Sequence, residues 1–272
     1  MNRETIKEIM SSEGILPQSK FGQNFLCDEK IISSIVSLCG AGRDTRVLEI
    51  GPGLGSLTVP LSGITDHLTC VEIDSGLAAF LSDSIPGAEI VNRDFLKYEC
   101  PFEPDVVVSN IPYYVMTDIM KKLFSEYSGA RSMVFMVEEE ATARIDCGPN
   151  SKQYGPLAVL CALYGTYSFE FKVPHTAFVP QPRTTSAVIS FSRTESADIL
   201  SPDFVKFLNT CFSMRRKMLK KNLLQSASSE AVSDAFSYLG ISGNVRAEEL
   251  SPSEFAELYK QLKKMSVRLS LQ

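Results

Sequence analysis

Residues 105–114 read Asp-Val-Val-Val-Ser-Asn-Ile-Pro-Tyr-Tyr, an apolar run followed directly by a stiff polar corner. Three β-branched valines beside turn residues are typical of a buried central strand in a parallel sheet. Pro112 fixes its own φ and biases Ile111 towards an extended backbone. The stretch therefore predicts a strand that ends in a rigid turn.

This corner combines groups that suit a flat base carrying an amino group. Asn110 offers a side-chain carbonyl, and the backbone carbonyl of Ile111 follows it. Tyr113 and Tyr114 add aromatic faces. Because an exocyclic amino group donates two hydrogen bonds, two carbonyls beside a stacking ring predict an adenine site. The alternative is a plain strand-to-helix turn that happens to contain Asn and Pro.

A glycine-rich turn follows an earlier apolar strand, residues 45–50, and precedes a helix. Gly51, Gly53 and Gly55 lie in this turn. Glycines let a ligand approach the backbone, and a helix start presents free N–H groups. Glu72 ends the next strand, about 20 residues further on, where an acid can accept hydrogen bonds from both ribose hydroxyls.

Two nucleotide ligands are compatible with this turn. A dinucleotide such as NAD needs the full G-x-G-x-x-G pattern, which brings its pyrophosphate onto the helix. Here Glu49 precedes Gly51-x-Gly53-x-Gly55. That arrangement suits a ligand without phosphates, such as S-adenosylmethionine, so we favour this methyl donor and keep NAD as the alternative.

A third strand, residues 88–93, ends next to Asp94, which is well placed to accept from the adenine amino group of the donor. The alternative is that Asp94 is a solvent-exposed acid in a turn. In an open α/β sheet, ligands bind beyond the carboxyl ends of the strands. Four candidate residues fall at such ends, namely Gly51, Glu72, Asp94 and Asn110.

The order of the elements predicts the fold. Strands and helices alternate up to residue 164, and two alternating strands, residues 167–173 and 185–191, follow as a hairpin. This order predicts an α/β doubly wound, Rossmann-like sheet with an antiparallel edge hairpin. Between these strands, two prolines hold Phe178 on a stiff loop. Phe178 is either a second stacking face opposite Tyr113 or a core phenylalanine.

Near residue 195 the sequence pattern changes to predicted helices that are separated by Ser and Pro residues. We therefore expect a methyltransferase domain at 1–195 and a small helical domain at 196–272. Net charge is −5, but the segment 204–229 contains no acid and six basic residues: Lys206, Arg215, Arg216, Lys217, Lys220 and Lys221. A basic run without acids favours phosphate contact, although a solvated helix face is the alternative.

Composition excludes several classes of protein. No apolar run approaches the ~20 residues that span a bilayer, and the first residues lack the apolar core of a signal peptide. The seven cysteines form no C-x-x-C pair, and only two histidines accompany them. We therefore expect no metal site, reduced thiols and a cytoplasmic protein without a membrane partner.

Taken together, these motifs resemble the ribosomal RNA adenine N6,N6-dimethyltransferases, and among them the small-subunit dimethyladenosine transferases. The resemblance extends from Phe21 to about Leu258. The segments that carry it are Phe21-Gly-Gln-Asn-Phe-Leu26, Glu49-Ile-Gly-Pro-Gly-Leu-Gly55, Val71-Glu-Ile-Asp74, Asn110-Ile-Pro-Tyr113, Phe178-Val-Pro-Gln-Pro182, Arg215-Arg-Lys-Met-Leu219 and Arg246-Ala-Glu-Glu-Leu-Ser251.

The resemblance implies a Rossmann-like class I methyltransferase fold, a helical domain that orients the RNA, an activity and its partners. The activity would be methyl transfer from S-adenosylmethionine, leaving S-adenosylhomocysteine, to two adjacent adenosines near the 3′ end of the 16S rRNA. The partner would be the small ribosomal subunit or its precursor, which gives the enzyme a role in subunit biogenesis. We expect it to act as a monomer.

The resemblance also implies site residues. The donor site would use Asn24, Leu26, Gly51, Gly53, Glu72, Ile73, Asp94, Phe95 and Asn110. The catalytic site for the target base would use Asn110, Ile111, Pro112, Tyr113 and Phe178. RNA phosphates would meet Arg215, Arg216, Lys217, Lys220 and Lys221.

Other functions share parts of this pattern. A large-subunit (23S) rRNA dimethyltransferase of the antibiotic-resistance type has the same donor site and the Asn-Ile-Pro-Tyr motif. The segments 215–217 and 246–249 favour the small-subunit type. A DNA-adenine or protein-glutamine methyltransferase would carry Pro in place of Ile111. A non-catalytic ribosome-assembly or RNA-binding factor on this fold is a further alternative.

Overall fold

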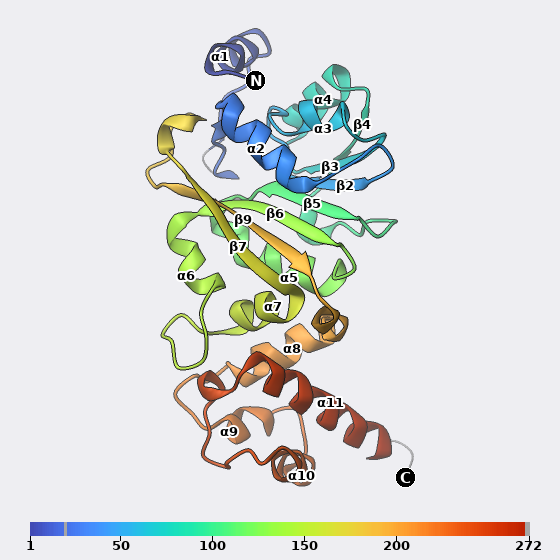
Figure 1. Ribbon diagram of the computed structural model, residues 1–272, viewed down its shortest axis with the longest axis vertical. Helices are drawn as coiled ribbons and strands as arrows, with labels where there is room; N and C mark the ends of the chain where they lie inside the picture. The colour runs from blue at the N-terminus through green and yellow to red at the C-terminus, as the bar shows by residue number, and fades with distance from the viewer. Residues whose placement is uncertain (19–20, 270–272) are drawn as a thin grey trace. The chain divides into compact units, whose positions relative to one another are not determined.

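The structure is a computed structural model that describes residues 1–18 and 21–269 (Figure 1). It forms two compact units. The first contains Met1–Met120, Gly129–Thr142 and Thr166–Arg193, and the second contains Lys121–Ser128, Ala143–Gly165 and Thr194–Gln272. The domain boundary expected after residue 195 stays a prediction, and the last three residues of the expected helical domain lie outside the described part.

A seven-stranded sheet forms the first unit, in the order β4-β3-β2-β5-β6-β9-β7. Strands β4, β3, β2, β5 and β6 run parallel, and β9 pairs antiparallel with β6. The predicted doubly wound sheet with an antiparallel edge is confirmed. The bounds are β2 (Arg46–Ile50), β3 (His67–Glu72), β4 (Ala88–Asn92), β5 (Val106–Asn110), β6 (Ser132–Glu138), β7 (Gly165–Val173) and β9 (Ser186–Arg193).

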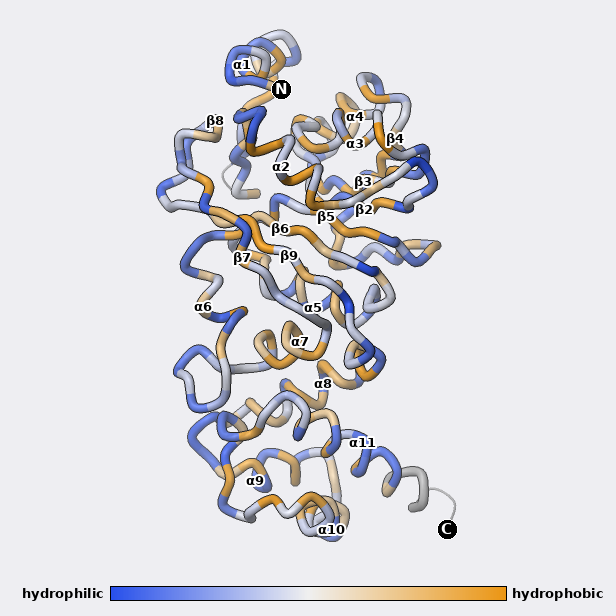
Figure 2. Tube along the Cα trace, viewed as in Figure 1, coloured by the Kyte–Doolittle hydropathy of each residue, from blue (hydrophilic) through white to orange (hydrophobic). Residues whose placement is uncertain are grey.

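The strand quoted at the outset lies inside this sheet. β5 pairs with β2 on one side and with β6 on the other, so Val106, Val107 and Val108 are fully buried. Figure 2 shows hydrophobic residues along β2, β5 and β6. Since both faces of a doubly wound sheet are covered, its central strands carry continuous apolar runs instead of alternating ones.

Short helices and turns of the first unit connect and cover these strands. Asp28 caps α2 by accepting from the backbone of Lys30 and Ile31, and Ile32 and Ile35 face the core. A two-stranded sheet pairs β1 (Phe25–Leu26) with β8 (Phe178–Val179). The other elements are α1 (Arg3–Ser12), α2 (Glu29–Cys39), α3 (Thr58–Ser62), α4 (Ser75–Ser84), η2 (Phe95–Lys97), η3 (Tyr113–Val115), η4 (Glu139–Ala141) and η5 (His175–Ala177). Two further helices, α5 (Met116–Glu126) and α6 (Thr142–Ile145), have residues in both units.

The second unit is built mainly of helices. Ser201 caps α8 ahead of Pro202, and Gly240 ends α10 in the left-handed conformation that glycine favours. Among the described residues, no helix is long and apolar enough to cross a membrane. The elements are α7 (Pro156–Tyr164), η6 (Glu195–Ile199), α8 (Pro202–Cys211), α9 (Leu219–Leu223), α10 (Ser229–Leu239), η7 (Ala247–Glu249) and α11 (Pro252–Leu269).

Candidate active site

A cavity of about 290 Å³ lies in the first unit beyond the carboxyl ends of β2, β3 and β5. Five parts of the chain line it, namely residues within 21–26, 49–57, 71–77, 93–96 and 110–119, which explains why no single motif revealed the whole site. It brings together twelve of the residues predicted for the donor and the target base, namely Asn24, Leu26, Gly51, Gly53, Glu72, Ile73, Asp94, Phe95, Asn110, Ile111, Pro112 and Tyr113.

Two residues of the glycine turn, Gly51 and Gly53, line the cavity. Gly53 has φ +60°, and a Cβ there would lie 3.2 Å from the ring of Phe25. Gly55 has φ +86°, and a Cβ there would lie 2.9 Å from Leu81. Both positions therefore need glycine, for the backbone conformation and for close packing.

Glu72 joins the end of β3 to the glycine turn. Its Oε2 accepts from the backbone N–H of Gly53 at 3.1 Å, and its Oε1 accepts from that of Asp74 at 2.9 Å. Burial raises the pKa of this carboxyl, while the two N–H groups oppose that rise. Each carboxylate oxygen accepts more than one hydrogen bond, so Glu72 keeps acceptor capacity for hydroxyl groups of a ligand.

Glu49 is a second acid on the cavity wall, and it is almost fully buried. Desolvation by burial raises its pKa to about 7. The thiol of Cys70 donates to its Oε2 at 3.5 Å. The sequence placed Glu49 ahead of the glycines but assigned it no role, because its burial depends on neighbouring strands. A positive charge in this cavity would favour its ionised form.

The Asn110 corner is held by hydrogen bonds from three directions. The Asn110 Nδ2 group donates to the backbone oxygen of Asn24 at 3.3 Å. The N–H of Ile111 donates to Met136 on β6 at 3.0 Å, and the Tyr113 hydroxyl bonds the Ser186 hydroxyl. With its nitrogen engaged, Asn110 keeps its side-chain oxygen as an acceptor for a ligand.

The rim carries Asp94 and three apolar side chains that face solvent. Asp94 accepts from the backbone of Leu96 at 3.0 Å and so caps the short η2 helix. Ile73, Leu96 and Tyr114 are 44%, 37% and 61% exposed at the cavity. Exposed apolar side chains that gather at one cavity indicate a ligand with an apolar face.

Phe178 lies elsewhere. Its side chain is fully buried among the core residues of the first unit, and it does not line the cavity. Its backbone pairs with Leu26 across the small β1–β8 sheet. The structure thus places Phe178 as the core phenylalanine of the alternative explanation. A stacking role stays a prediction that requires its ring to become accessible.

The sequence alone did not reveal a set of hydrogen bonds beside the cavity, in which Asp74 binds Gln18 and Gln23. Asp74 caps α4, and its Oδ2 accepts from Gln18 at 2.7 Å and from Gln23 at 3.0 Å. An Asp directly before a helix is a recognisable cap. Its second role, accepting hydrogen bonds from two residues that are 56 and 51 positions away in the chain, has no local signal.

The predicted RNA-binding residues belong to the second unit and divide into two groups. Arg215 and Lys220 are half-buried and bind other parts of the chain. The remaining three, Arg216, Lys217 and Lys221, are exposed.

The cysteines and the two histidines form no obvious site. All seven cysteines are free, and five of them are buried. Within residues 1–18 and 21–269, no group of three or more His, Cys, Asp or Glu side chains is placed so that it could hold a metal ion.

Comparisons with known proteins agree with one another. A family model described as "Ribosomal RNA adenine dimethylase" matches residues 16–264. The "Ribosomal RNA small subunit methyltransferase A" of Geobacillus thermodenitrificans is 34% identical, over 94% of this chain and 94% of that protein. The protein of the same name from Acinetobacter baylyi is 36% identical, over 92% of this chain and 94% of that protein.

Solved structures have the same fold. A dimethyladenosine transferase from Plasmodium falciparum gives a TM-score of 0.74 at 22% identity, covering 89% of this chain and 98% of that one. The 23S rRNA methyltransferase ErmE gives a TM-score of 0.60 at 26% identity, covering 88% of this chain and 100% of that one.

Proposed function

The chain belongs to the ribosomal RNA adenine dimethylase family, and we propose that its cavity binds S-adenosylmethionine while the Asn110 corner binds a target adenine. The protein is an S-adenosylmethionine-dependent rRNA adenine dimethyltransferase. The observation that supports these sites is the cavity at the carboxyl ends of the strands, lined by glycines, acids and the Asn110 corner together.

Each part of the cavity suits one part of the donor. Glu72, with its spare acceptor capacity, would accept from the ribose hydroxyls, and Asp94 from the adenine amino group. Ile73 and Leu96 would cover the apolar faces of the adenine. The positive φ of Gly53 lets the chain turn sharply enough to leave room for the donor beside the backbone.

Donor binding is expected to depend on pH through Glu49. Its pKa of about 7 in the free protein means that the carboxyl is substantially protonated below that pH. The donor carries a sulfonium and an ammonium group, which favour the carboxylate, so affinity should rise from pH 6 to pH 8. Calorimetric titrations across that range measure the effect, which Glu49→Gln should flatten. An unchanged slope in Glu49→Gln would contradict this role.

The target base needs activation, because the lone pair of adenine N6 is drawn into the ring. Asn110 Oδ1 and the backbone oxygen of Ile111 would accept its two hydrogens and favour a more tetrahedral nitrogen. Tyr113 would stack on the base, a contact worth roughly 1–3 kcal/mol. When bound, the donor supplies an activated methyl group on sulfur. The residues contribute positioning, and no strong base is needed because the nitrogen becomes acidic once alkylated.

Dimethylation places a further demand on this corner. After the first transfer, N6 retains one hydrogen, so one of the two carbonyl contacts must be given up. The methyl group then needs space beside Asn110 or Ile111. We propose that the corner leaves enough free space to accept the monomethylated base in a shifted position.

We propose the small ribosomal subunit or its precursor as the substrate, with two adjacent adenosines near the 3′ end of the 16S rRNA. The identity to small-subunit methyltransferases over more than nine tenths of the chain supports this choice. Such an enzyme would act in the cytoplasm, as a monomer, during small-subunit biogenesis.

The substrate is tested with methyl-labelled S-adenosylmethionine, small subunits that lack dimethyladenosine, and large-subunit RNA in parallel. We expect label only in the small-subunit RNA, recovered as N6,N6-dimethyladenosine. Label confined to large-subunit RNA would assign the protein to the resistance type. Donor binding without label in either RNA would favour a binding factor over an enzyme.

A further inference from the structure

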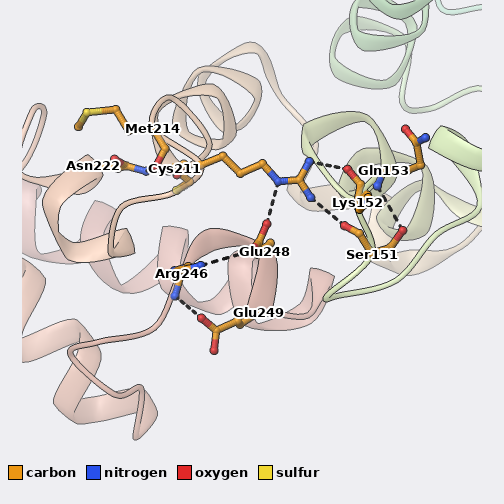
Figure 3. Close-up of polar contacts among 10 residues, drawn as sticks. Ser151, Lys152, Gln153, Cys211, Met214, Asn222, Arg246, Glu248 and Glu249 are labelled. Atoms are coloured by element: carbon orange, nitrogen blue, oxygen red, sulfur yellow. Dashed lines mark hydrogen bonds and ion pairs between the residues drawn. The ribbon is translucent and has the colours of Figure 1, made fainter.

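Arg215, Arg216 and Lys217 lie between α8 and α9, on a turn that is held by hydrogen bonds. The N–H of Lys217 donates to the backbone oxygen of Met214 at 2.9 Å and closes the turn. Asn222 on α9 is fully buried, and its Nδ2 donates to Cys211 at 2.6 Å and to Met214 at 3.4 Å (Figure 3). The turn, residues 214–217, therefore has a defined backbone conformation.

Arg215 points from this turn towards a separate loop of the second unit. Its Nε donates to Glu248 Oε2 at 2.7 Å, and its Nη1 and Nη2 donate to the backbone oxygens of Lys152 and Ser151 at 2.6 and 2.8 Å (Figure 3). The guanidinium thus binds three protein oxygens. Charge-assisted hydrogen bonds of this kind are about twice as strong as neutral ones.

The partners of Arg215 are themselves tied together. The N–H of Asn150 donates to the backbone oxygen of Glu248 at 2.8 Å, and Arg246 lies 4.0 Å from the Glu248 carboxylate. Arg215 therefore joins three segments, namely the turn 214–217, the loop 148–154 and the turn 246–249. A phosphate at Arg215 would have to compete with these contacts.

The next two residues are exposed. The side chains of Arg216 and Lys217 make no hydrogen bond or ion pair with another described residue. Two neighbouring cations on a fixed turn are well suited to RNA phosphates, because less conformational freedom is lost on binding.

We propose that Arg215 is a positioning residue and not a phosphate contact. It clamps the turn 214–217 to the loop 148–154, so that Arg216 and Lys217 are presented to RNA in one orientation. This inference rests on the proposed function, since it assumes that the protein binds rRNA. Lysine cannot replace Arg215 in this role, because a single ammonium group lacks the planar fork that reaches three oxygens.

Arg215→Lys separates the two roles. A phosphate contact would tolerate lysine, which binds phosphate as a point charge. A clamp would not, so Arg215→Lys and Arg215→Ala should both raise KM for the small subunit about tenfold. We expect kcat and donor affinity to stay unchanged in both variants. Faster hydrogen exchange at the Asn150 amide would show directly that the loop has been released.

For Glu248→Ala, the two roles of Arg215 predict opposite changes in RNA affinity. If Arg215 contacted phosphate, removing its acidic partner would free the guanidinium and tighten RNA binding. For a clamp, the same change releases the turn and weakens binding, as Arg215→Ala does, and the effects of the two changes should not add. Glu230→Ala is the matched control, because Glu230 is an exposed acid on α10 whose loss removes the same charge.

Salt dependence identifies the residues that contact phosphate. The double variant Arg216→Ala with Lys217→Ala should reduce the slope of log affinity against log salt by about 1.5, because each lost phosphate contact removes about 0.7–0.9. Wild-type affinity in Arg215→Lys, or tighter RNA binding in Glu248→Ala, would overturn the clamp. Failure of the wild-type protein to bind small-subunit RNA would instead overturn the proposed function.

Discussion

Asn110→Ala is expected to lower kcat for methyl transfer by about 100- to 1000-fold, the range found when one preorganised hydrogen-bonding group of an active site is removed. The Asn110 side-chain oxygen is the acceptor proposed for the target amino group, and its amide nitrogen is held by Asn24 at 3.3 Å. Alanine keeps the turn, which Pro112 and the Ile111–Met136 hydrogen bond maintain.

Single-turnover methylation of small subunits at saturating donor measures this effect. Asn244→Ala is the matched control, because Asn244 is an exposed asparagine of the second unit and does not line the cavity. That control should retain kcat near the wild-type value. Donor affinity in Asn110→Ala, measured by calorimetry, should change only a few-fold. A wild-type rate in Asn110→Ala would remove Asn110 from the mechanism.

Glu72→Ala is expected to weaken binding of S-adenosylmethionine by about 100-fold, because hydrogen bonds to a charged group contribute about 1.5–3 kcal/mol each. The carboxylate is proposed to accept from the ribose, and it also holds the glycine turn through Gly53 at 3.1 Å. Alanine removes both functions. Calorimetric titration with the donor gives the affinity directly.

Glu72→Gln distinguishes a direct contact between Glu72 and the donor from support of the glycine turn by Glu72. Glutamine keeps one acceptor oxygen and a similar volume, so it should preserve more of the turn than alanine does and lose about tenfold in affinity. Thermal unfolding of both variants controls for loss of the fold. Donor affinity that is unchanged in a folded Glu72→Ala protein would show that the cavity binds the donor without this acid.

Much of the donor site was predictable because its residues occupy the ends of strands. Apolar runs identify the strands, and a parallel sheet collects their carboxyl ends at one edge. Gly51, Glu72, Asp94 and Asn110 were therefore expected to meet, and all four line one cavity. The fold follows from the same information, since strand–helix alternation leaves few topologies open.

The sequence by itself determined which polar residues lie at the ends of strands. It also determined the fold class and the family motifs. The tertiary structure decided which way individual side chains point. Phe178 is enclosed by the core, and Arg215 turns inward while Arg216 and Lys217 face solvent. Burial and hydrogen-bond partners depend on segments distant in the chain, so they leave no local pattern. For the same reason the raised pKa of Glu49 follows only from the strands packed around it.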